Sequence, residues 1–172
     1  MLSLGSNQGD RLAHLDFAVV SLANYPGIEF VRASSVYETT AHVLNPDEPQ
    51  PDFLNATLQV MTSLTPRQLL GACLTIEQKR GRQRSPNARW KPRTLDIDIL
   101  TYGDLCSNEA ALTLPHPRMA ERRFVLQPLF EIAPDLKIPA PFDQSVQYLL
   151  EHCADNAPVD VFPERLAEPR KE

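Results

Sequence analysis

From Arg89 to Leu100 the chain reads RWKPRTLDIDIL, and this segment carries its most informative pattern. Its second half alternates acidic and aliphatic residues, which is the period of a β-strand with one buried face. Successive side chains of a strand point to opposite faces, so Asp96 and Asp98 share a face, with Cα atoms roughly 6–7 Å apart. This spacing suits two hard cations held about 3.5–4 Å apart, as two-metal phosphoryl-transfer sites require.

The chain just before this strand is strongly basic, although the whole chain is acidic with a formal net charge of −5. Carboxylates for a metal beside arginines for phosphate are what an enzyme acting on a nucleoside triphosphate requires. The alternative is the solvent face of an antiparallel sheet with solvated ion pairs, and the acid pair alone does not separate the two. The basic run favours the anion site; between Gln78 and Leu95 it contains no acid and comprises Lys79, Arg80, Arg82, Arg84, Arg89, Lys91 and Arg93.

The composition is that of an ordinary globular chain. With 172 residues, 42% of them hydrophobic and 23% charged, it is long enough for one domain with its own core. Its mild acidity argues against a general nucleic-acid or membrane binder, and we expect neither partner. Three widely spaced cysteines without a Cys-x-x-Cys motif indicate no disulfide framework and no zinc site. The sequence has neither a membrane-span nor a signal-peptide pattern, so we expect a cytoplasmic protein.

Hydrophobic periodicity and turn signals divide the chain into alternating strands and helices. Helices are expected from about residue 12 to 25, from Pro66 after the cap Thr65 to about 80, over 119–132 and over 145–153. A long loop is expected over 39–52, a turn or hairpin over 103–113, and strands over 1–4, 28–37, 53–62 and 96–102.

This order of elements is the split βαβ pattern of ferredoxin-like folds. The sequence therefore predicts an α+β fold in which helices pack on a mainly antiparallel sheet, with the late helix on the opposite face in an α/β/α arrangement. We expect a single domain over residues 1–157. Prolines and charges beyond it predict a flexible C-terminal tail over residues 158–172.

Several separated motifs together resemble one enzyme family. They are Gly5-Ser6-Asn7, Phe53-Leu54-Asn55-Ala56, Ile76-Glu77, Gly81-Arg82, Pro92-Arg93-Thr94-Leu95-Asp96-Ile97-Asp98-Ile99, Leu114-Pro115-His116, and the run from Pro128 to Pro134. In this order and spacing they resemble 6-hydroxymethyl-7,8-dihydropterin pyrophosphokinase, an enzyme of folate biosynthesis. The resemblance implies transfer of pyrophosphate from ATP to the pterin hydroxymethyl group, leaving AMP, with two magnesium ions. We expect a monomer, with a dimer as the alternative.

The resemblance carries site residues over to this chain. It places the metal ions on Asp96 and Asp98, which also count as catalytic together with Arg82, Arg84 and Arg93. The same three arginines bind ATP in this interpretation, together with Glu77, Ile99, His116 and Arg122. The pterin is assigned to Thr39, Thr40, Phe53, Asn55, Trp90 and Phe124.

Some of these assignments have a rationale in the residues themselves. Phe53 and Asn55 alternate and so share one strand face, where an aromatic ring and an amide suit a flat heteroaromatic substrate. The alternatives are simple core packing for Phe53 and Phe124, a satisfied loop residue for His116, and a surface acid for Glu77.

The chain departs from the family pattern at three places. Lys91 stands where a small residue is usual, Pro117 stands where an aromatic residue is common, and the 39–52 loop is longer than in some relatives. Three other functions stay open at this level. They are an RNA-binding module on a ferredoxin-like sheet, a metal-dependent nuclease that uses the same carboxylates, and a degenerate pseudoenzyme.

Overall fold

The computed structural model describes residues 1–41, 50–82 and 92–169. The first part of the chain forms β1 (Leu2–Ser6), α1 (Arg11–Ala23), β2 (Ile28–Ala33), β3 (Tyr37–Thr39), β4 (Phe53–Thr62), α2 (Pro66–Lys79) and β5 (Asp96–Ile99). The second part forms β6 (Ser107–Glu109), β7 (Leu112–Leu114), the 3-10 helix η1 (Met119–Glu121), α3 (Arg123–Ile132), β8 (Lys137–Ile138), β9 (Gln144–Ser145), α4 (Val146–Glu151) and β10 (Asp160–Val161).

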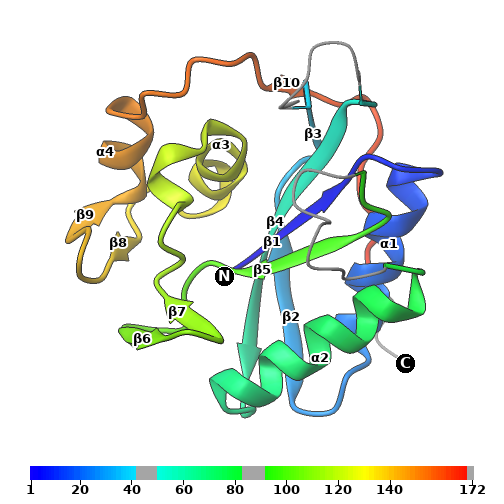
Figure 1. The fold of residues 1–172 in the computed structure, drawn as a ribbon, viewed down its shortest axis with the longest axis horizontal. Helices are drawn as coiled ribbons and strands as arrows, with labels where there is room; N and C mark the ends of the chain where they lie inside the picture. Colours follow the sequence, from blue (N-terminus) through cyan, green and yellow to red (C-terminus); the bar gives the residue numbers. More distant parts are fainter. Residues whose placement is uncertain (42–49, 83–91, 170–172) are drawn as a thin grey trace.

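The fold consists of three layers with a sheet in the middle (Figure 1). The described residues form a six-stranded sheet in the order β10-β3-β4-β1-β5, and β2 also pairs with β4. All of these pairings are antiparallel. Helices α1 and α2 cover one face, and α3 and α4 lie on the other side (Figure 1). The predicted α+β, ferredoxin-like fold is therefore confirmed. Among the described residues, no helix has the length and apolarity to cross a membrane.

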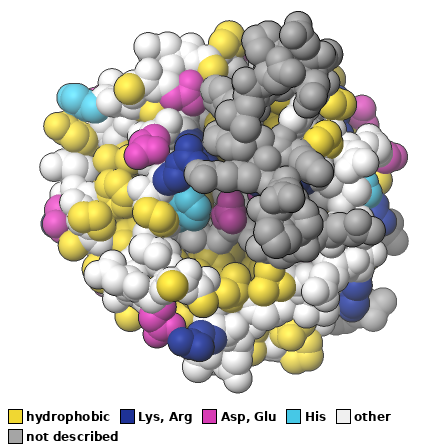
Figure 2. Space-filling view, viewed as in Figure 1, with side chains coloured by type: hydrophobic (Ala, Val, Ile, Leu, Met, Phe, Trp, Pro, Cys, Tyr) yellow, Lys and Arg dark blue, Asp and Glu magenta, His cyan; other side chains and the backbone are white. Residues whose placement is uncertain are grey.

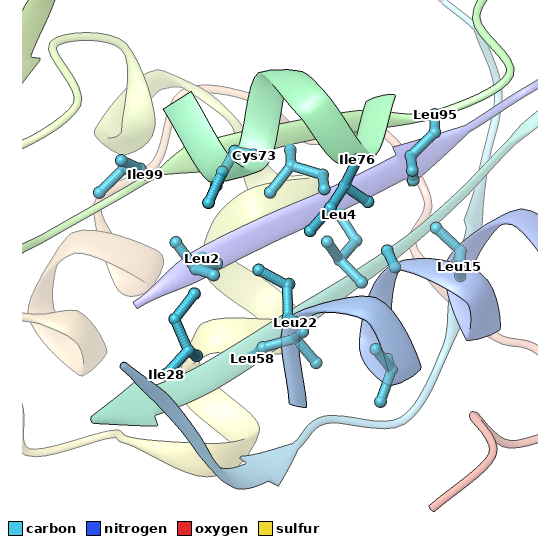
Figure 3. Close-up of a cluster of buried hydrophobic side chains, with 14 of the residues drawn as sticks. Leu2, Leu4, Leu15, Leu22, Ile28, Leu58, Cys73, Ile76, Leu95 and Ile99 are labelled. Carbon is cyan, nitrogen blue, oxygen red and sulfur yellow. The ribbon is translucent and has the colours of Figure 1, made fainter. Parts of the chain in front are cut away.

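Strand alternation sorts the side chains of the central strands between the two faces. Leu2 and Leu4 of β1 point toward α1 and α2, where Figure 3 shows them packed with Leu22 and Ile76. In the register between β1 and β5, Gly5 lies opposite Asp96 and Ser3 opposite Asp98. The two carboxylates therefore project from the face on the α3 side of the sheet.

Helix α2 begins and ends where local chemistry predicts. The Thr65 side chain accepts from the backbone of Gln68, and the Gln68 side chain accepts from Thr65 N, which makes a capping box. Pro66 occupies the first turn, and Gly81 follows the helix with a φ of 79°, a left-handed conformation that glycine adopts without strain. The predicted helix over 66–80 is confirmed.

Three predicted strands differ from the observed ones. β1 extends to Ser6, because Gly5 and Ser6 pair with Asn55 and Leu54 of β4 rather than closing the strand. The strand expected over 28–37 is divided into β2 and β3 at Ser34. The backbone N of Ser34 donates to Thr57 O, and its hydroxyl, in place of a backbone carbonyl, accepts from Thr57 N. β5 ends at Ile99, three residues earlier than expected.

The helix expected over 119–132 is also divided. The 3-10 turn η1 ends before Arg122, which has an extended backbone with φ −125° and ψ 102°, and α3 begins at Arg123. The carboxylate of Asp155 accepts from Arg123 N at 3.0 Å and so satisfies a free donor at the start of α3. A partner more than thirty residues away along the chain leaves no local signal in the sequence.

The segment beyond residue 157 differs from the predicted flexible tail. β10 pairs with β3, with Asp160 opposite Glu38, and Phe162 N donates to Val36 O at 2.8 Å. Phe162 and Leu166 also pack against the core under α1 and α2. The described part of this segment is therefore joined to the sheet.

We expect Phe162→Ala to lower the free energy of unfolding by about 1–2 kcal/mol, because a half-buried aromatic side chain is removed from the core. Val161→Ala is the matched control, since Val161 is 65% exposed in the same strand. Urea denaturation of both variants measures the difference. Equal effects would show that Phe162 contributes no more than an exposed neighbour.

Candidate active site

A cavity of about 560 Å³ lies on the α3 side of the sheet. Its walls come from β1, β3, β4, β5, the segment from Arg118 to Val125, and Ala154-Asp155. This volume is in the range of small-molecule and cofactor sites. Figure 2 shows basic, acidic and histidine side chains gathered near the middle of the molecular face seen in Figure 1. The sequence-predicted residues that line the cavity are Thr39, Thr40, Phe53, Asn55, Arg93, Asp96, Asp98, Arg122 and Phe124.

Asp96 is held by two arginines. Its carboxylate accepts hydrogen bonds from Arg82 Nη1 and from Arg93 Nη1, and only 14% of its side chain is exposed. Burial disfavours the charged form, but the two guanidinium groups outweigh it and hold the pKa of Asp96 below its ordinary value. Asp96 is therefore an ionised carboxylate at neutral pH.

Asp98 lies in the opposite electrostatic situation. No side chain of the described residues donates a hydrogen bond or forms an ion pair with it. Burial, together with the negative charge of Asp96, raises the pKa of Asp98 to about 6, although Arg122 and Arg82 oppose the rise. The two acids thus differ although they lie two residues apart on one strand. The negative charge of Asp96 is balanced by two arginines, whereas that of Asp98 is not balanced by a direct ion pair among the described residues.

Glu77, a predicted ATP contact, is not among the residues that line the cavity. Its side chain is 1% exposed beneath β5. There it accepts from Arg82 Nη1 at 2.7 Å and from Ile97 N at 2.8 Å. Arg82 also donates to Leu95 O at 3.1 Å, so its guanidinium is fixed between Glu77, the backbone and Asp96. Glu77 is thus a buried anchor for Arg82 and not a surface acid, and its contact with ATP stays a prediction.

Ile99 is a second predicted ATP contact whose side chain does not line the cavity. Its side chain is 3% exposed and belongs to the core on the α2 side, where Figure 3 shows it beside Cys73. It therefore points away from the cavity. Arg84 and Trp90, two further predicted site residues, lie outside the described residues, as does Lys91.

His116 lies next to the cavity without lining it. Its backbone N donates to Leu100 O at 2.8 Å, and its Nδ1 accepts from Arg118 N at 3.2 Å. Burial lowers the pKa of His116, and the charges of Arg122 and Arg118 lower it further, so the imidazole is neutral at pH 7. The prediction that it contacts nucleotide phosphates stays a prediction.

The comparison with protein families decides the assignment. Residues 1–134 match the family model of 7,8-dihydro-6-hydroxymethylpterin-pyrophosphokinase (HPPK). The chain belongs to the HPPK family. The resemblance stated from the sequence motifs is confirmed, and so is the class of enzyme, a pyrophosphokinase.

Relatives named 2-amino-4-hydroxy-6-hydroxymethyldihydropteridine pyrophosphokinase support this assignment. The protein of Synechocystis is 47% identical over 135 residues, which cover 78% of this chain and 66% of the relative. That of Methylorubrum extorquens is 48% identical over 137 residues, covering 80% and 84%. That of Haemophilus influenzae is 37% identical over 162 residues, covering 94% and 97%. The chain thus spans slightly less than two thirds of the Synechocystis protein.

Solved structures with a similar fold are larger proteins. The Plasmodium falciparum HPPK-DHPS A437G structure with pteroate aligns at a TM-score of 0.67 and 14% identity, covering 87% of this chain and 40% of that chain. A structure described as HPPK-DHPS in complex with substrates aligns at a TM-score of 0.63 and 15% identity, covering 87% and 42%. At these identities the similarity shows the fold alone, and it agrees with the observed HPPK architecture.

Nine residues of the HPPK cavity wall were not among the predicted site residues, and they include the amide and charged side chains of Gln50, Arg118, Glu121 and Asp155. Arg118 Nε lies 3.5 Å from Glu121 Oε2, one turn of η1 apart. Asp155 joins the wall because it accepts from Arg123 N and Ala157 N. Arg118 directly precedes the helix predicted over 119–132 and lies four residues before Arg122, and this pair of basic residues is the sequence signal for it.

The acids of this HPPK cavity suit magnesium shared with phosphate. Among the described residues there is no cluster of three or more His, Cys, Asp or Glu side chains able to hold a metal on their own. Mg²⁺ is commonly bound by one or two carboxylates together with water and substrate phosphates, whereas structural zinc requires a full protein ligand set. Asp96 and Asp98, with the uncompensated charge on Asp98, therefore fit Mg²⁺ that arrives with a nucleotide.

Proposed function

We propose that this chain transfers a diphosphoryl group from ATP to the hydroxymethyl group of 6-hydroxymethyl-7,8-dihydropterin, giving AMP and the pterin diphosphate, in folate biosynthesis. One observation supports this most: the wall of a single cavity combines the acid pair and Arg93 with two aromatic rings and a buried amide. The first set suits a triphosphate with its cations. The second suits a flat, polar heterocycle.

The phosphate end is assigned to arginines on two sides of the acid strand. Arg93, Arg118 and Arg122 line the cavity and present guanidinium groups that bind phosphate oxygens in pairs. Asp96 and Asp98 would hold two Mg²⁺, which supply charge neutralisation on the triphosphate when bound. In our proposal the pterin hydroxyl attacks the β-phosphorus in line. The protein contributes mainly positioning and electrostatic stabilisation of the transferred group.

The pterin end is assigned to β3, β4 and the start of α3. Asn55 is 3% exposed and its Nδ2 donates to Thr39 Oγ1 at 2.8 Å, which fixes the orientation of the amide. Phe53 and Phe124 line the same cavity, and a pterin ring between them would stack on both. The Arg122 guanidinium lies 5.7 Å from the centroid of the Phe124 ring, so the two ends of the site adjoin.

Release of AMP tests the reaction directly. We expect the chain, mixed with ATP, Mg²⁺ and hydroxymethyldihydropterin, to release AMP and pterin diphosphate in equal amounts. Formation of ADP would overturn diphosphoryl transfer. Nucleotide release from RNA or DNA would favour the nuclease, and salt-sensitive RNA binding without Mg²⁺ would favour the RNA-binding module.

Phe124→Ala should raise KM for the pterin about tenfold, because an aromatic stacking surface is worth roughly 1–1.5 kcal/mol beyond ordinary burial. The expected change in kcat is small. Phe130→Ala on the same helix is the matched control, since Phe130 packs in the second core cluster and is not part of the cavity wall. Steady-state kinetics measure KM and kcat of both variants. An equal rise of KM in Phe124→Ala and Phe130→Ala would indicate a general disturbance of α3.

Arg82→Ala and Arg84→Ala should slow turnover roughly 10–100-fold and weaken nucleotide binding much less. For Arg82 the structure supplies the reason, because its guanidinium orients Asp96 and is itself fixed by Glu77. Single-turnover rates and nucleotide Kd values measure the two effects separately. Equal losses in both would show that these arginines act in binding alone.

Location and assembly belong to the same proposal. We propose a cytoplasmic monomer, and its acidic composition supports the absence of nucleic-acid and membrane partners. Light scattering of the purified protein tests the monomer.

A further inference from the structure

The buried amide of Asn7 lies between the two chain segments that flank the cavity. Asn7 directly follows β1 and is 0% exposed. Its Oδ1 accepts from Arg93 N at 2.7 Å, and its backbone N donates to Arg93 O at 3.0 Å. Its Nδ2 donates to Pro51 O at 3.2 Å and to Gln50 Oε1 at 3.3 Å. One side chain thus bonds to both segments at once.

Each of these two segments leads directly into one end of the site. Arg93 lines the cavity and bonds to Asp96 through its guanidinium, so its backbone position sets the geometry of the acid strand. Gln50 also lines the cavity, and Pro51 lies two residues before β4, which begins with Phe53. Asn7 therefore joins the segment at Arg93 to the segment at Gln50-Pro51 through the hydrogen bonds of one buried side chain.

Such a connection has an energetic consequence. A buried amide that loses one of its partners keeps an unsatisfied polar group, which is costly in a site without water. A displacement of the Arg93 backbone therefore favours a matching displacement at Gln50-Pro51. A ligand that fixes one segment lowers the cost of ordering the other, and this coupling is reciprocal.

We propose that Asn7 is a positioning residue that couples nucleotide binding at the Arg93 side to pterin binding at the Gln50 side. The inference rests on the proposed function, since it takes ATP and the pterin as the two ligands. Asn7 touches neither ligand in this role. It acts through the backbone of Arg93 and Pro51 and through the Gln50 side chain.

The chain offers a closely matched set of variants. Asn7→Asp keeps an oxygen that accepts from Arg93 N but replaces the donor toward Pro51 O and Gln50 Oε1 with a second acceptor, so it breaks one side of the connection. Asn7→Ala removes both sides. Ser6→Ala is the control, because Ser6 is adjacent and also 0% exposed, and its hydroxyl has no hydrogen-bond partner among the described residues.

The test measures the Kd of hydroxymethyldihydropterin by calorimetry, with and without a non-hydrolysable ATP analogue and Mg²⁺. The ratio of the two Kd values is the coupling. We expect Asn7→Asp to reduce this ratio at least about fivefold, while its Kd for the nucleotide analogue alone stays within about twofold of the wild type. Ser6→Ala should retain the wild-type ratio.

The outcomes separate the inference from the reaction on which it rests. A wild-type protein that releases no AMP overturns the proposed function. A wild-type protein that releases AMP but shows no coupling, or an Asn7→Asp variant that keeps the full ratio, overturns only the role of Asn7. An equal loss of the Kd ratio in Ser6→Ala also overturns the role of Asn7, because it shows that any change at the end of β1 has this effect. Thermal melting of each variant confirms that folded protein is compared, and Asn7→Asp decides if Asn7→Ala does not fold.

Discussion

Asp98→Asn is expected to lower turnover by roughly 10³-fold or more while it makes the metal-free protein more stable at neutral pH. The loss of activity follows if Asp98 holds a catalytic cation, because the amide has no charge to neutralise that cation. The gain in stability follows because burial and the negative charge of Asp96 penalise the Asp98 carboxylate more than Arg122 and Arg82 stabilise it. AMP release measures the first effect, and urea denaturation in the presence of a chelator measures the second.

The pH dependence of this gain has a definite sign. The pKa of Asp98 is raised from its ordinary 3.8 to about 6 in the folded chain, so between these values the folded state binds more protons than the unfolded state. Stability therefore falls as pH rises through about 6, and the charge penalty is complete above it. We expect the variant to exceed the wild type by on the order of 2 kcal/mol at pH 7.5 and by almost nothing below about pH 4.

Asp104→Asn is the control for this experiment, because Asp104 is an exposed aspartate on the turn before β6. It should change neither turnover nor the pH dependence of unfolding. If Asp98→Asn were less stable than the wild type at pH 7.5, the carboxylate would have a favourable partner in the free protein. The interpretation that the charge of Asp98 is stabilised only by a bound cation would then be wrong.

The elements that were predicted correctly are those specified by neighbouring residues. β4 begins at Phe53 and ends at Thr62, as its period-two alternation predicts. α2 has its start encoded in Thr65 and Pro66 and its end in Gly81. In both cases the deciding interactions lie within a few residues, so the sequence alone contains the necessary information.

The elements that were missed depend on distant partners. The break between β2 and β3 follows from bonds between Ser34 and Thr57, and β10 exists because Asp160 meets Glu38 across the chain. Pairing over such separations depends on how the whole sheet assembles. The prolines near residue 160 suggested a tail, but the chain there pairs with β3 at the edge of the sheet.

The site shows the same division. Alternation alone placed Asp96 and Asp98 on one face and paired Phe53 with Asn55, and the cavity contains all four. The same alternation, applied to Ile99, predicts a side chain on the opposite face from Asp98, and the core position of Ile99 agrees with it. The family resemblance had suggested an ATP contact there. Glu77 lies four residues after Cys73 and so on the buried face of α2, but an acid at such a position becomes buried only with partners such as Arg82 and Ile97 N, which the helix itself does not supply.

Asp96→Asn is expected to have the opposite effect on stability from Asp98→Asn, with an equally large loss of turnover. In the wild type, Asp96 accepts from Arg82 and Arg93, whose side chains are 14% and 31% exposed. The amide leaves both guanidinium groups without their carboxylate, and breaking a buried ion pair from one side costs about 3–5 kcal/mol. We discount this to about 2–4 kcal/mol, because Glu77 still accepts from Arg82 and Arg93 is partly solvated.

Urea denaturation at pH 7.5 measures this loss, and a double-mutant cycle with Arg93→Gln assigns it. The cycle should give a coupling energy of at least about 1 kcal/mol between Asp96 and Arg93, and none between Asp98 and Arg93. Additive effects in the first cycle would show that Arg93 does not stabilise Asp96. Typical domains are stable by 5–15 kcal/mol, so the variant should stay folded and its lost turnover can be assigned to the site. Opposite stability changes from two acids on one strand would mean that the protein neutralises Asp96 itself and leaves the charge of Asp98 for a ligand cation.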